Sequence, residues 1–417
     1  MDQTNAKPYH RFVINNGLTV IGIPDKSTRL IGVCVLYKVG SRDELPDKTG
    51  IAHLFEHLMF SNSGKSVDFD TIMQFAGAES NAFTTPDTTQ YYNIAPDSCL
   101  ELIIQMEAIR MEGFKVSKKD FLVQQKVVIE EFAENYLNNP YGLFSHWLMD
   151  LAYTQHPYKW PVIGKNSEQI ASLQYQDASD FYHQYYHPSN AVLVVSGNFE
   201  KSQLEDLVEK HFGKIAAGTP NRNQYLQEPN QNTKREKIVQ GQFPEDALYI
   251  AWPSSARNST DFYALDMATD ILSDGKSSLL YSELKKKKML FSGIDCYLTA
   301  TTDPGLIILE GKLREGIQRE QALLEIRNLL DKFVSDGISE HTWEKYINKN
   351  ESAYYFSQLG VINQALNYSY SEWLGDPDLV MHEFEKYRSL SKEQVIASVR
   401  DYLGEDQGSY LFLENGN

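Results

Sequence analysis

The amino-acid sequence predicts two related domains of the α+β class. The chain has 417 residues, which is more than one core usually organises and enough for two domains of about 200 residues each. Short β-branched runs alternate with longer segments of helical periodicity, and this order starts again after a polar segment near the middle of the chain. We therefore expect a sheet packed with helices in each half, and an internal duplication.

The expected domains are residues 1–220 and 237–417, joined by a linker at 221–236. Residues 216–236 are rich in Pro, Asn, Gln and Gly and contain few large apolar side chains, which is typical of a linker. The stretch "DALYIAWPSSARNSTDFYALDMATDILSDG" then repeats the strand, polar turn and helix of the first half. Its helix has no histidine, so we expect histidine-based chemistry only in the first domain.

Composition and charge exclude several classes of protein. An apolar fraction of 42% with 12% aromatic residues is typical of a folded globular chain. The 39 basic and 56 acidic residues give a net charge of −17, which disfavours nucleic acids and suits cationic or neutral ligands. We interpret the basic run from Lys285 to Lys288 as a solvated helix face. The three cysteines, Cys34, Cys99 and Cys296, are odd in number and lie among apolar neighbours, which favours reduced thiols and a reducing compartment.

The beginning of the chain carries no sign of export. "MDQTNAKPYHRF" lacks the charged start, apolar stretch and cleavage site of a signal peptide, and no apolar stretch approaches 18 residues. We expect a cytoplasmic protein without a membrane span, or a periplasmic or organellar one if a leader was removed.

A cluster of ionisable residues occurs inside the apolar run "GIAHLFEHLMF", residues 50–60. Its apolar positions recur at helical spacing, so His53 and His57, four residues apart, share one helix face beside Glu56. Two imidazoles suit zinc, and Glu56 could act as general base towards water activated by the metal. The order H-x-x-E-H is the inverzincin motif. The alternative is a pair of core histidines that bond to nearby carbonyl groups.

A catalytic zinc site needs a third protein ligand, and "VVIEEFAEN" offers three carboxylates. Glu130 and Glu134 share one helix face, whereas Glu131 points about 100° away, beside Val127 and Val128. A carboxylate on the apolar side needs a partner, which a metal ion supplies. An acidic solvated stripe describes Glu130 and Glu134 better, so Glu131 is the predicted ligand.

The sequence resembles the pitrilysin and insulinase family of zinc metallopeptidases, which includes the mitochondrial processing peptidase. Besides "HLFEH", the resemblance rests on "VGSRDE", "TGIAH", "NAFTTPDTTQYY", "VVIEE", "HPYKWPVIG" and "HPSNAVLVVSGN" in the first domain, and on "SDGKSSLLYSEL" and "DPGLIILEG" in the second. It covers nearly the whole chain. It implies a metalloendopeptidase with one zinc ion held by His53, His57 and Glu131, with Glu56 as the base. It also implies two domains, each a mostly antiparallel sheet packed with helices, that form half of a clamshell.

Two departures from the family pattern stand out. Many members have a further glutamate seven residues before the third ligand, where this chain has Gln124, which cannot add charge. Active members also have an arginine and a tyrosine in the second domain, at the places of Lys285 and Ser292. The resemblance therefore implies the zinc-bearing subunit of a heterodimeric, bacterial-type enzyme, whose related partner brings the Arg/Tyr pair.

Substrate recognition is predicted at "NAFT", which comprises Asn81, Ala82, Phe83 and Thr84. This segment resembles the edge strand with which the family binds an extended peptide through main-chain pairing. We expect unfolded peptide substrates, preferably basic ones; the alternative is an ordinary hairpin. Two other functions remain open at this point: a non-catalytic, structural core-type subunit, and a homodimeric peptidase.

Overall fold

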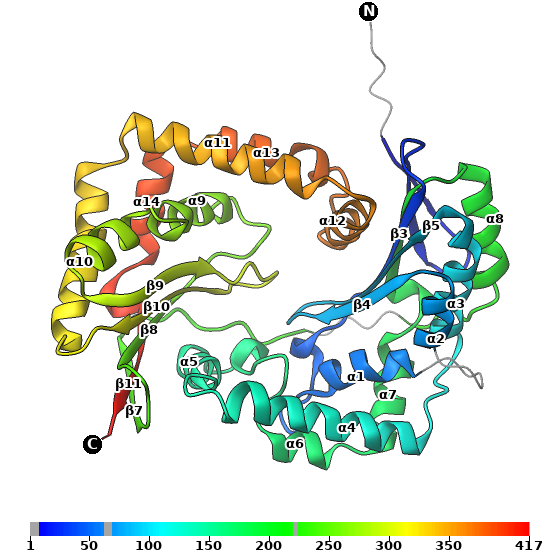
Figure 1. Cartoon of the computed structure of the whole chain (residues 1–417), viewed down its shortest axis with the longest axis horizontal. Helices are drawn as coiled ribbons and strands as arrows, with labels where there is room; N and C mark the ends of the chain where they lie inside the picture. Colours follow the sequence, from blue (N-terminus) through cyan, green and yellow to red (C-terminus); the bar gives the residue numbers. More distant parts are fainter. Residues whose placement is uncertain (1–7, 62–68, 220–223, 417) are drawn as a thin grey trace, which may run out of the picture. The chain divides into compact units, whose positions relative to one another are not determined.

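The computed structural model describes residues 8–61, 69–219 and 224–416, and the chain divides into two compact units (Figure 1). Unit 1 consists of Met1–Phe132, Val162–Gln224 and Tyr355–Met381, and unit 2 of Ala133–Pro161, Tyr225–Tyr354 and His382–Asn417. The first seven residues and residues 221–223 of the predicted linker lie outside the described part.

The two units differ from two consecutive halves of the chain. The chain passes from unit 1 to unit 2 between Gln224 and Tyr225, inside the segment predicted as a linker. However, residues 133–161 of the first half belong to unit 2, and residues 355–381 of the second half belong to unit 1. The predicted boundaries at 1–220 and 237–417 do not include this exchange.

Unit 1 contains a six-stranded sheet with the strand order β1-β2-β6-β3-β5-β4. Only β2 and β6 run parallel, and the other neighbours are antiparallel. Strand β4 lies at the edge and pairs with β5 in a register that sets Thr84 opposite Thr89. The strands are β1 (His10–Val13), β2 (Thr19–Pro24), β3 (Leu30–Tyr37), β4 (Glu79–Thr84), β5 (Thr89–Pro96) and β6 (Ala191–Gly197).

Unit 2 repeats this sheet with one strand fewer. Its order β7-β11-β8-β10-β9 corresponds to β2-β6-β3-β5-β4, and again only the first pair is parallel. The duplication and the mostly antiparallel sheets predicted from the sequence are therefore confirmed. The strands are β7 (Arg235–Gly241), β8 (Ala247–Pro253), β9 (Phe291–Leu298), β10 (Leu306–Leu313) and β11 (Ser409–Asn415).

Helices cover the sheet of unit 1. Helix α12 packs on the strands through a core in which Ala365 and Tyr368 contact Cys34, Leu36 and other strand residues. Helix α1 lies beside β4 and also contacts α4. The helices are α1 (Ile51–Phe60), α2 (Phe69–Phe75), α3 (Leu100–Glu112), α4 (Lys118–Phe132), α6 (Ser167–Ser172), α7 (Tyr175–Tyr185), α8 (Lys201–Phe212) and α12 (Val361–Trp373).

The sheet of unit 2 is covered on both faces. Alternate residues of β8 point to opposite sides: Ile250 belongs to the core with α9, α10 and α14, whereas Tyr249 belongs to the core with α5. Helix α5 is built from the first half of the chain and α12 from the second, so the halves exchange one sheet-covering helix each. The helices are α5 (Phe144–Ala152), α9 (Phe262–Ser273), the π-helix η6 (Leu280–Lys287), α10 (Arg319–Asp336), α11 (Glu340–Ser357), α13 (Leu379–Arg388) and α14 (Lys392–Tyr402). The last three residues of α11 and the first three of α13 belong to unit 1.

Two further expectations concern cysteines and membrane spans. All three cysteines are free thiols, and Cys34 and Cys296 are buried. Burial raises the pKa of the Cys34 thiol to about 12, which makes it unreactive. None of the helices in the described ranges is long and apolar enough to cross a membrane.

Candidate active site

Helix α1 forms because its apolar residues can be buried on one side while its polar residues remain accessible. Leu54, Phe55 and Leu58 are fully buried. The Phe55 ring packs 4.5 Å from the Tyr186 ring and 5.3 Å from the Phe181 ring, measured between centroids, so α7 and its following residue support the helix. The half-buried residues His53, Glu56, His57 and Phe60 form the opposite stripe.

A carboxylate from outside the helix caps the N-terminus of α1. The capping position is Gly50, whose φ of 88° lies in the left-handed region that favours glycine. A side chain there would also meet the Ile163 carbonyl oxygen at 2.7 Å. Glu44 Oε1 accepts hydrogen bonds from the backbone N–H groups of Gly50 and Ala52, at 3.1 and 2.9 Å. The buried Glu44 therefore satisfies donors that a helix start leaves unpaired.

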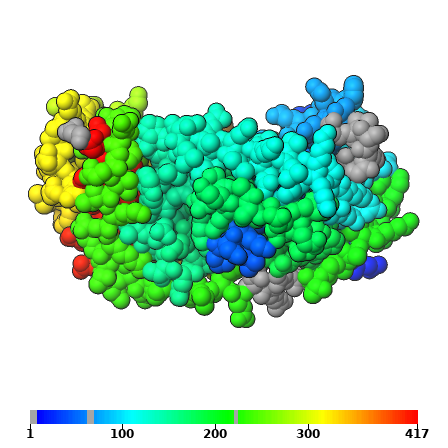
Figure 2. Space-filling model, turned by 90° about the horizontal axis from the view of Figure 1, so that it is seen from below, coloured from blue at the N-terminus to red at the C-terminus, as the bar shows by residue number. Residues whose placement is uncertain are grey.

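The loop between Glu44 and α1 is fixed from its other side. Its residues 45–47 are exposed, and Figure 2 shows a blue surface patch from this early part of the chain bordered by green residues from much later in the sequence. The Pro46 carbonyl accepts hydrogen bonds from Lys165 and Gln169, at 2.8 and 3.3 Å, and Lys48 pairs with Asp177 at 2.5 Å. These contacts hold the start of α1 against α6 and α7.

Helix α4 places the third predicted ligand. Its buried residues include Val128 and Phe132, and the buried Gln125 side chain donates hydrogen bonds to carbonyl groups of α6 and Leu173. These contacts orient the helix so that Glu131 faces α1, whereas Glu130 is exposed. The face assigned to Glu131 from helical geometry is therefore the one that the structure presents to His53 and His57.

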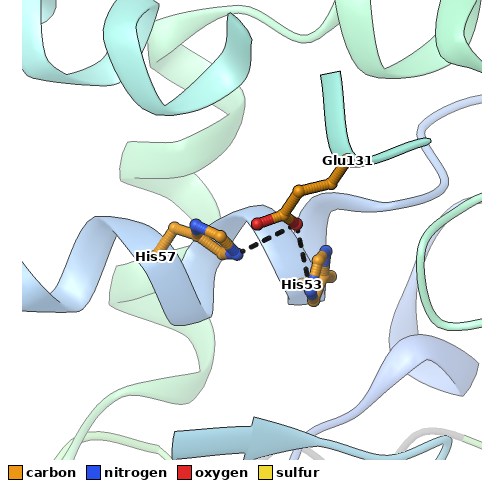
Figure 3. Close-up of side chains that lie close together, drawn as sticks. All are labelled: His53, His57 and Glu131. Carbon is orange, nitrogen blue, oxygen red and sulfur yellow. Dashed lines mark ion pairs between the residues drawn. The ribbon is translucent and has the colours of Figure 1, made fainter. Parts of the chain in front are cut away.

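His53, His57 and Glu131 converge on one point, as Figure 3 shows. Glu131 Oε2 lies 3.5 Å from His57 Nε2 and 4.0 Å from His53 Nε2, and one ligand atom from each residue lies within 4.8 Å of the others. The two imidazole rings are 4.9 Å apart and nearly perpendicular. This is the one cluster of three His, Cys, Asp or Glu residues with metal-binding geometry in the described ranges.

His53 is neutral at physiological pH. Burial, followed by the nearby His57, lowers the pKa of His53 to about 4. Its buried Nδ1 atom has no hydrogen-bond partner in the described part of the chain. His53 Nε2 and Glu131 Oε2, both able to donate an electron pair to a metal ion, lie 4.0 Å apart, a separation at which a cation can lie between them. The donor set therefore fits a metal ion.

Glu56 lies next to this cluster without belonging to it. Its Oε2 atom accepts a hydrogen bond of 2.5 Å from Thr84 Oγ1. Burial is the main cause that raises the pKa of Glu56, and the charge of Glu131 adds to it, while the hydrogen bonds from Thr84 and the nearby His57 lower it. A carboxylate with a raised pKa beside a metal-binding cluster has the properties of a general base.

The predicted substrate segment Asn81, Ala82, Phe83 and Thr84 lies on β4, one of the two edge strands of the unit 1 sheet. The strand runs beside α1, so the described structure brings this segment together with Glu56. Sequence reasoning assigned Thr84 only a main-chain role, and its side-chain contact with Glu56 was missed. Nothing in the local sequence pattern indicates this contact, because it depends on how β4 packs on α1.

The other predicted residues lie apart from the cluster or in unit 2. Gln124 is half-buried on α4, two turns before Glu131, and in the described ranges it forms no hydrogen bond with the three clustered side chains. Its influence on the metal stays a prediction. Lys285 lies on η6 with its ammonium group 5.4 Å from the centre of the Tyr281 ring, and Ser292 Oγ donates a hydrogen bond to Glu245 at 2.5 Å.

Two family models match successive parts of the chain. The model described as "Insulinase (Peptidase family M16)" matches residues 19–165, which contain the cluster and Glu56. The model described as "Peptidase M16 inactive domain" matches residues 172–350. The chain is also 29% identical to the zinc protease PqqE of Helicobacter pylori, over 98% of this chain and 93% of the relative.

Solved structures share this fold. The crystal structure of a protease from Helicobacter pylori has a TM-score of 0.92 and 27% sequence identity, and covers 97% of this chain and 99% of its own. The periplasmic protease PqqL from Escherichia coli matches with a TM-score of 0.79 and 15% identity, over 99% of this chain but only 48% of PqqL.

The two-domain fold and the family matches group this chain with relatives that are named zinc proteases. The chain belongs to peptidase family M16. This confirms the resemblance that the sequence motifs indicated.

We predict that the metal-free protein loses stability in acid partly through His53. The unfolded state takes up a proton near pH 6.5, whereas folded His53 does so only at about 4. The free energy of unfolding should therefore fall as the pH decreases through this window, by about 3 kcal/mol in total at roughly 1.4 kcal/mol per tenfold change in proton affinity.

The measurement is an NMR titration of the histidine ring protons in EDTA-treated protein, together with urea unfolding between pH 7 and 4. The variant His53→Gln should show a shallower loss of stability over this range. An NMR-derived pKa of His53 close to 6.5 would contradict the prediction.

Proposed function

We propose that this chain is the zinc-bearing subunit of an endopeptidase that hydrolyses unfolded peptides. The observation that carries the proposal is the convergence of His53, His57 and Glu131 within 4.8 Å, with the carboxylate of Glu56 beside them. Two imidazoles and one carboxylate form the protein ligand set of a catalytic zinc site, which keeps one further position open. The relative PqqE, whose name describes it as a zinc protease, supports the choice of metal.

Each residue has a defined task in this proposal. His53, His57 and Glu131 would hold zinc, which as a Lewis acid polarises a carbonyl group and makes water more acidic. Glu56 would take the proton of the attacking water at its carboxylate and deliver it to the leaving amine. The raised pKa of Glu56 suits both steps, because a base with a very low pKa would return the proton poorly.

The substrate would bind along β4. This strand has a free edge, and an extended peptide could continue the sheet of unit 1 through main-chain hydrogen bonds. Such pairing selects extended, unfolded segments and depends little on their side chains. The net charge of −17 would favour basic peptides.

The transition state needs a donor for the oxyanion, and this chain lacks the expected pair. Lysine cannot reproduce the planar fork of arginine, and the Ser292 hydroxyl is shorter than a tyrosine side chain and donates to Glu245. We therefore propose a related partner chain with an Arg/Tyr pair at the places of Lys285 and Ser292. The length of PqqL, about half of which this chain covers, supports an assembly from two chains of this size.

Two alternatives are less well supported. A structural core-type subunit would not need two adjacent histidines, a converging carboxylate and a separate base in one place. A homodimeric peptidase would need oxyanion donors other than Lys285 and Ser292.

The free buried thiols fit the expected cytoplasmic location.

The first prediction concerns the metal. The purified chain should bind about one zinc ion. Loss of a residue that only hydrogen-bonds to a metal ligand weakens metal binding by roughly 10-fold to 100-fold. Glu131→Gln removes a ligand itself and should weaken zinc binding more than this. Glutamine keeps the size of the side chain but removes the anionic oxygen. Glu130→Gln, on the same helix but exposed, is the matched control and should keep its zinc. Metal analysis after dialysis measures both, and a Glu131→Gln protein with full zinc content while Glu134→Gln loses it would refute the assignment.

The second prediction separates the base from the ligands. Glu56→Gln should retain zinc, because Glu56 lies outside the ligand set, while turnover falls by roughly 10² or more through loss of the proton acceptor. Zinc content and peptide hydrolysis are measured on the same preparation. If metal and activity disappear together, Glu56 is a ligand.

The third prediction concerns the partner. Alone, the chain should hydrolyse a quenched peptide slowly, and a related chain with the Arg/Tyr pair and without H-x-x-E-H should raise turnover by about 10²–10³, the cost of a missing oxyanion donor. A neighbouring gene that encodes such a chain identifies the candidate. Full activity of this chain at a concentration where it is monomeric would rule out the division of labour.

A further inference from the structure

Thr84 connects the proposed base with the strand proposed to receive the peptide. Its hydroxyl group donates to Glu56 Oε2 at 2.5 Å, and its backbone N–H group also interacts with this carboxylate. Hydrogen bonds to a charged acceptor of this length are among the stronger ones in proteins. Both partners are half-buried, so water competes only partly for the bond.

We propose that Thr84 is a positioning residue, whose hydroxyl group holds the Glu56 carboxylate in the orientation needed to accept the proton of the attacking water. This inference rests on the proposed function. A glutamate has three rotatable bonds, and a hydroxyl group fixed to one of its oxygens removes most of that freedom while it leaves the other oxygen for the proton.

The structure fixes Thr84 itself through the turn that follows it. The Thr85 carbonyl accepts a hydrogen bond from the backbone N–H of Ser41 at 3.2 Å. Two residues further, Asp87 forms an ion pair with Arg42 at 2.8 Å, and both side chains are largely buried. The turn after β4 is therefore attached to the short segment Ser41–Asp43.

The same segment continues into the cap of α1. Glu44 follows it directly and accepts the N–H groups of Gly50 and Ala52. Consequently, the strand that carries Thr84 and the helix that carries Glu56 are both anchored to residues 41–44. This explains why the hydroxyl and the carboxylate can be held at hydrogen-bond distance without a direct chain connection.

This arrangement would couple substrate binding to catalysis. A peptide that pairs with β4 lies along the main chain of the same strand that orients the base. Removing only the hydroxyl group leaves the main chain unchanged. It should therefore affect kcat and leave KM nearly constant, whereas a general distortion of the strand would raise KM as well.

The experiment uses the zinc-loaded chain together with its partner and compares Thr84→Val with Thr84→Ser. Valine has the shape of threonine without the hydroxyl group, so kcat should fall about tenfold or more. Serine restores the donor and should bring kcat back to within about threefold of the original protein. Zinc content should be unchanged in both variants, and a crystal structure of Thr84→Val should show Glu56 in more than one orientation.

Thr89→Val is the matched control on the neighbouring strand β5, because the Thr89 hydroxyl donates to the Val39 carbonyl and not to Glu56. It should leave kcat unchanged. If Thr84→Val keeps full kcat, or if Thr84→Ser is as impaired as Thr84→Val, the inference is wrong. The proposed function fails if the unsubstituted complex does not hydrolyse the peptide, or if Glu56→Gln does not abolish the hydrolysis. Either result can be distinguished from a failure of the inference about Thr84.

Discussion

The burial of one side of helix α1 determines where the site residues lie. Phe55 packs among the aromatic rings of α7 and its following residue, and Glu44 caps the first turn, so the helix can neither rotate nor slide without losing these contacts. Rotation by one residue would bury the imidazoles and expose Leu54 or Phe55. The positions of His53, Glu56 and His57 therefore follow from packing that involves none of these three side chains.

The electrostatics of the site follow from this partial burial. Half-buried side chains are less well solvated, so burial lowers the pKa of His53 and raises that of Glu56. The neutral His53 ring and the His57 ring then lie beside two carboxylates, Glu131 and Glu56, which repel each other. A divalent cation would offset this repulsion, and that makes the same residues a poor choice for a purely structural core.

Much of the site could be predicted from local patterns, and the remainder depends on tertiary packing. Helical spacing identifies the shared face of His53 and His57, and helical geometry selects Glu131 over its neighbours. The exchange of α5 and α12 between the units was not predictable, because an amphipathic helix has the same periodicity on either sheet. The contact between Thr84 and Glu56 was missed because it joins residues that are 28 positions apart and lie on different elements.

The second half of the duplication shows how the same scaffold is filled where the helix carries no histidine. In α9, the partly accessible residues Asp266 and Asp270 occupy a stripe like that of α1, while the residues between them are buried. Asp266 accepts a hydrogen bond from Tyr387, and Asp270 accepts one from Asn350 of α11 at 3.0 Å. Helix α11 follows α10 as α4 follows α3, so α11 and α4 correspond to each other. Helix α4 presents Glu131 to two imidazoles, whereas α11 presents the Asn350 amide to the Asp270 carboxylate. Burial raises the pKa of Asp270 to about 7, and protonation or an amide partner satisfies it without a metal. The repeated geometry is therefore compatible with either a metal-binding or a hydrogen-bonded cluster, and the side chains on two helices decide between them.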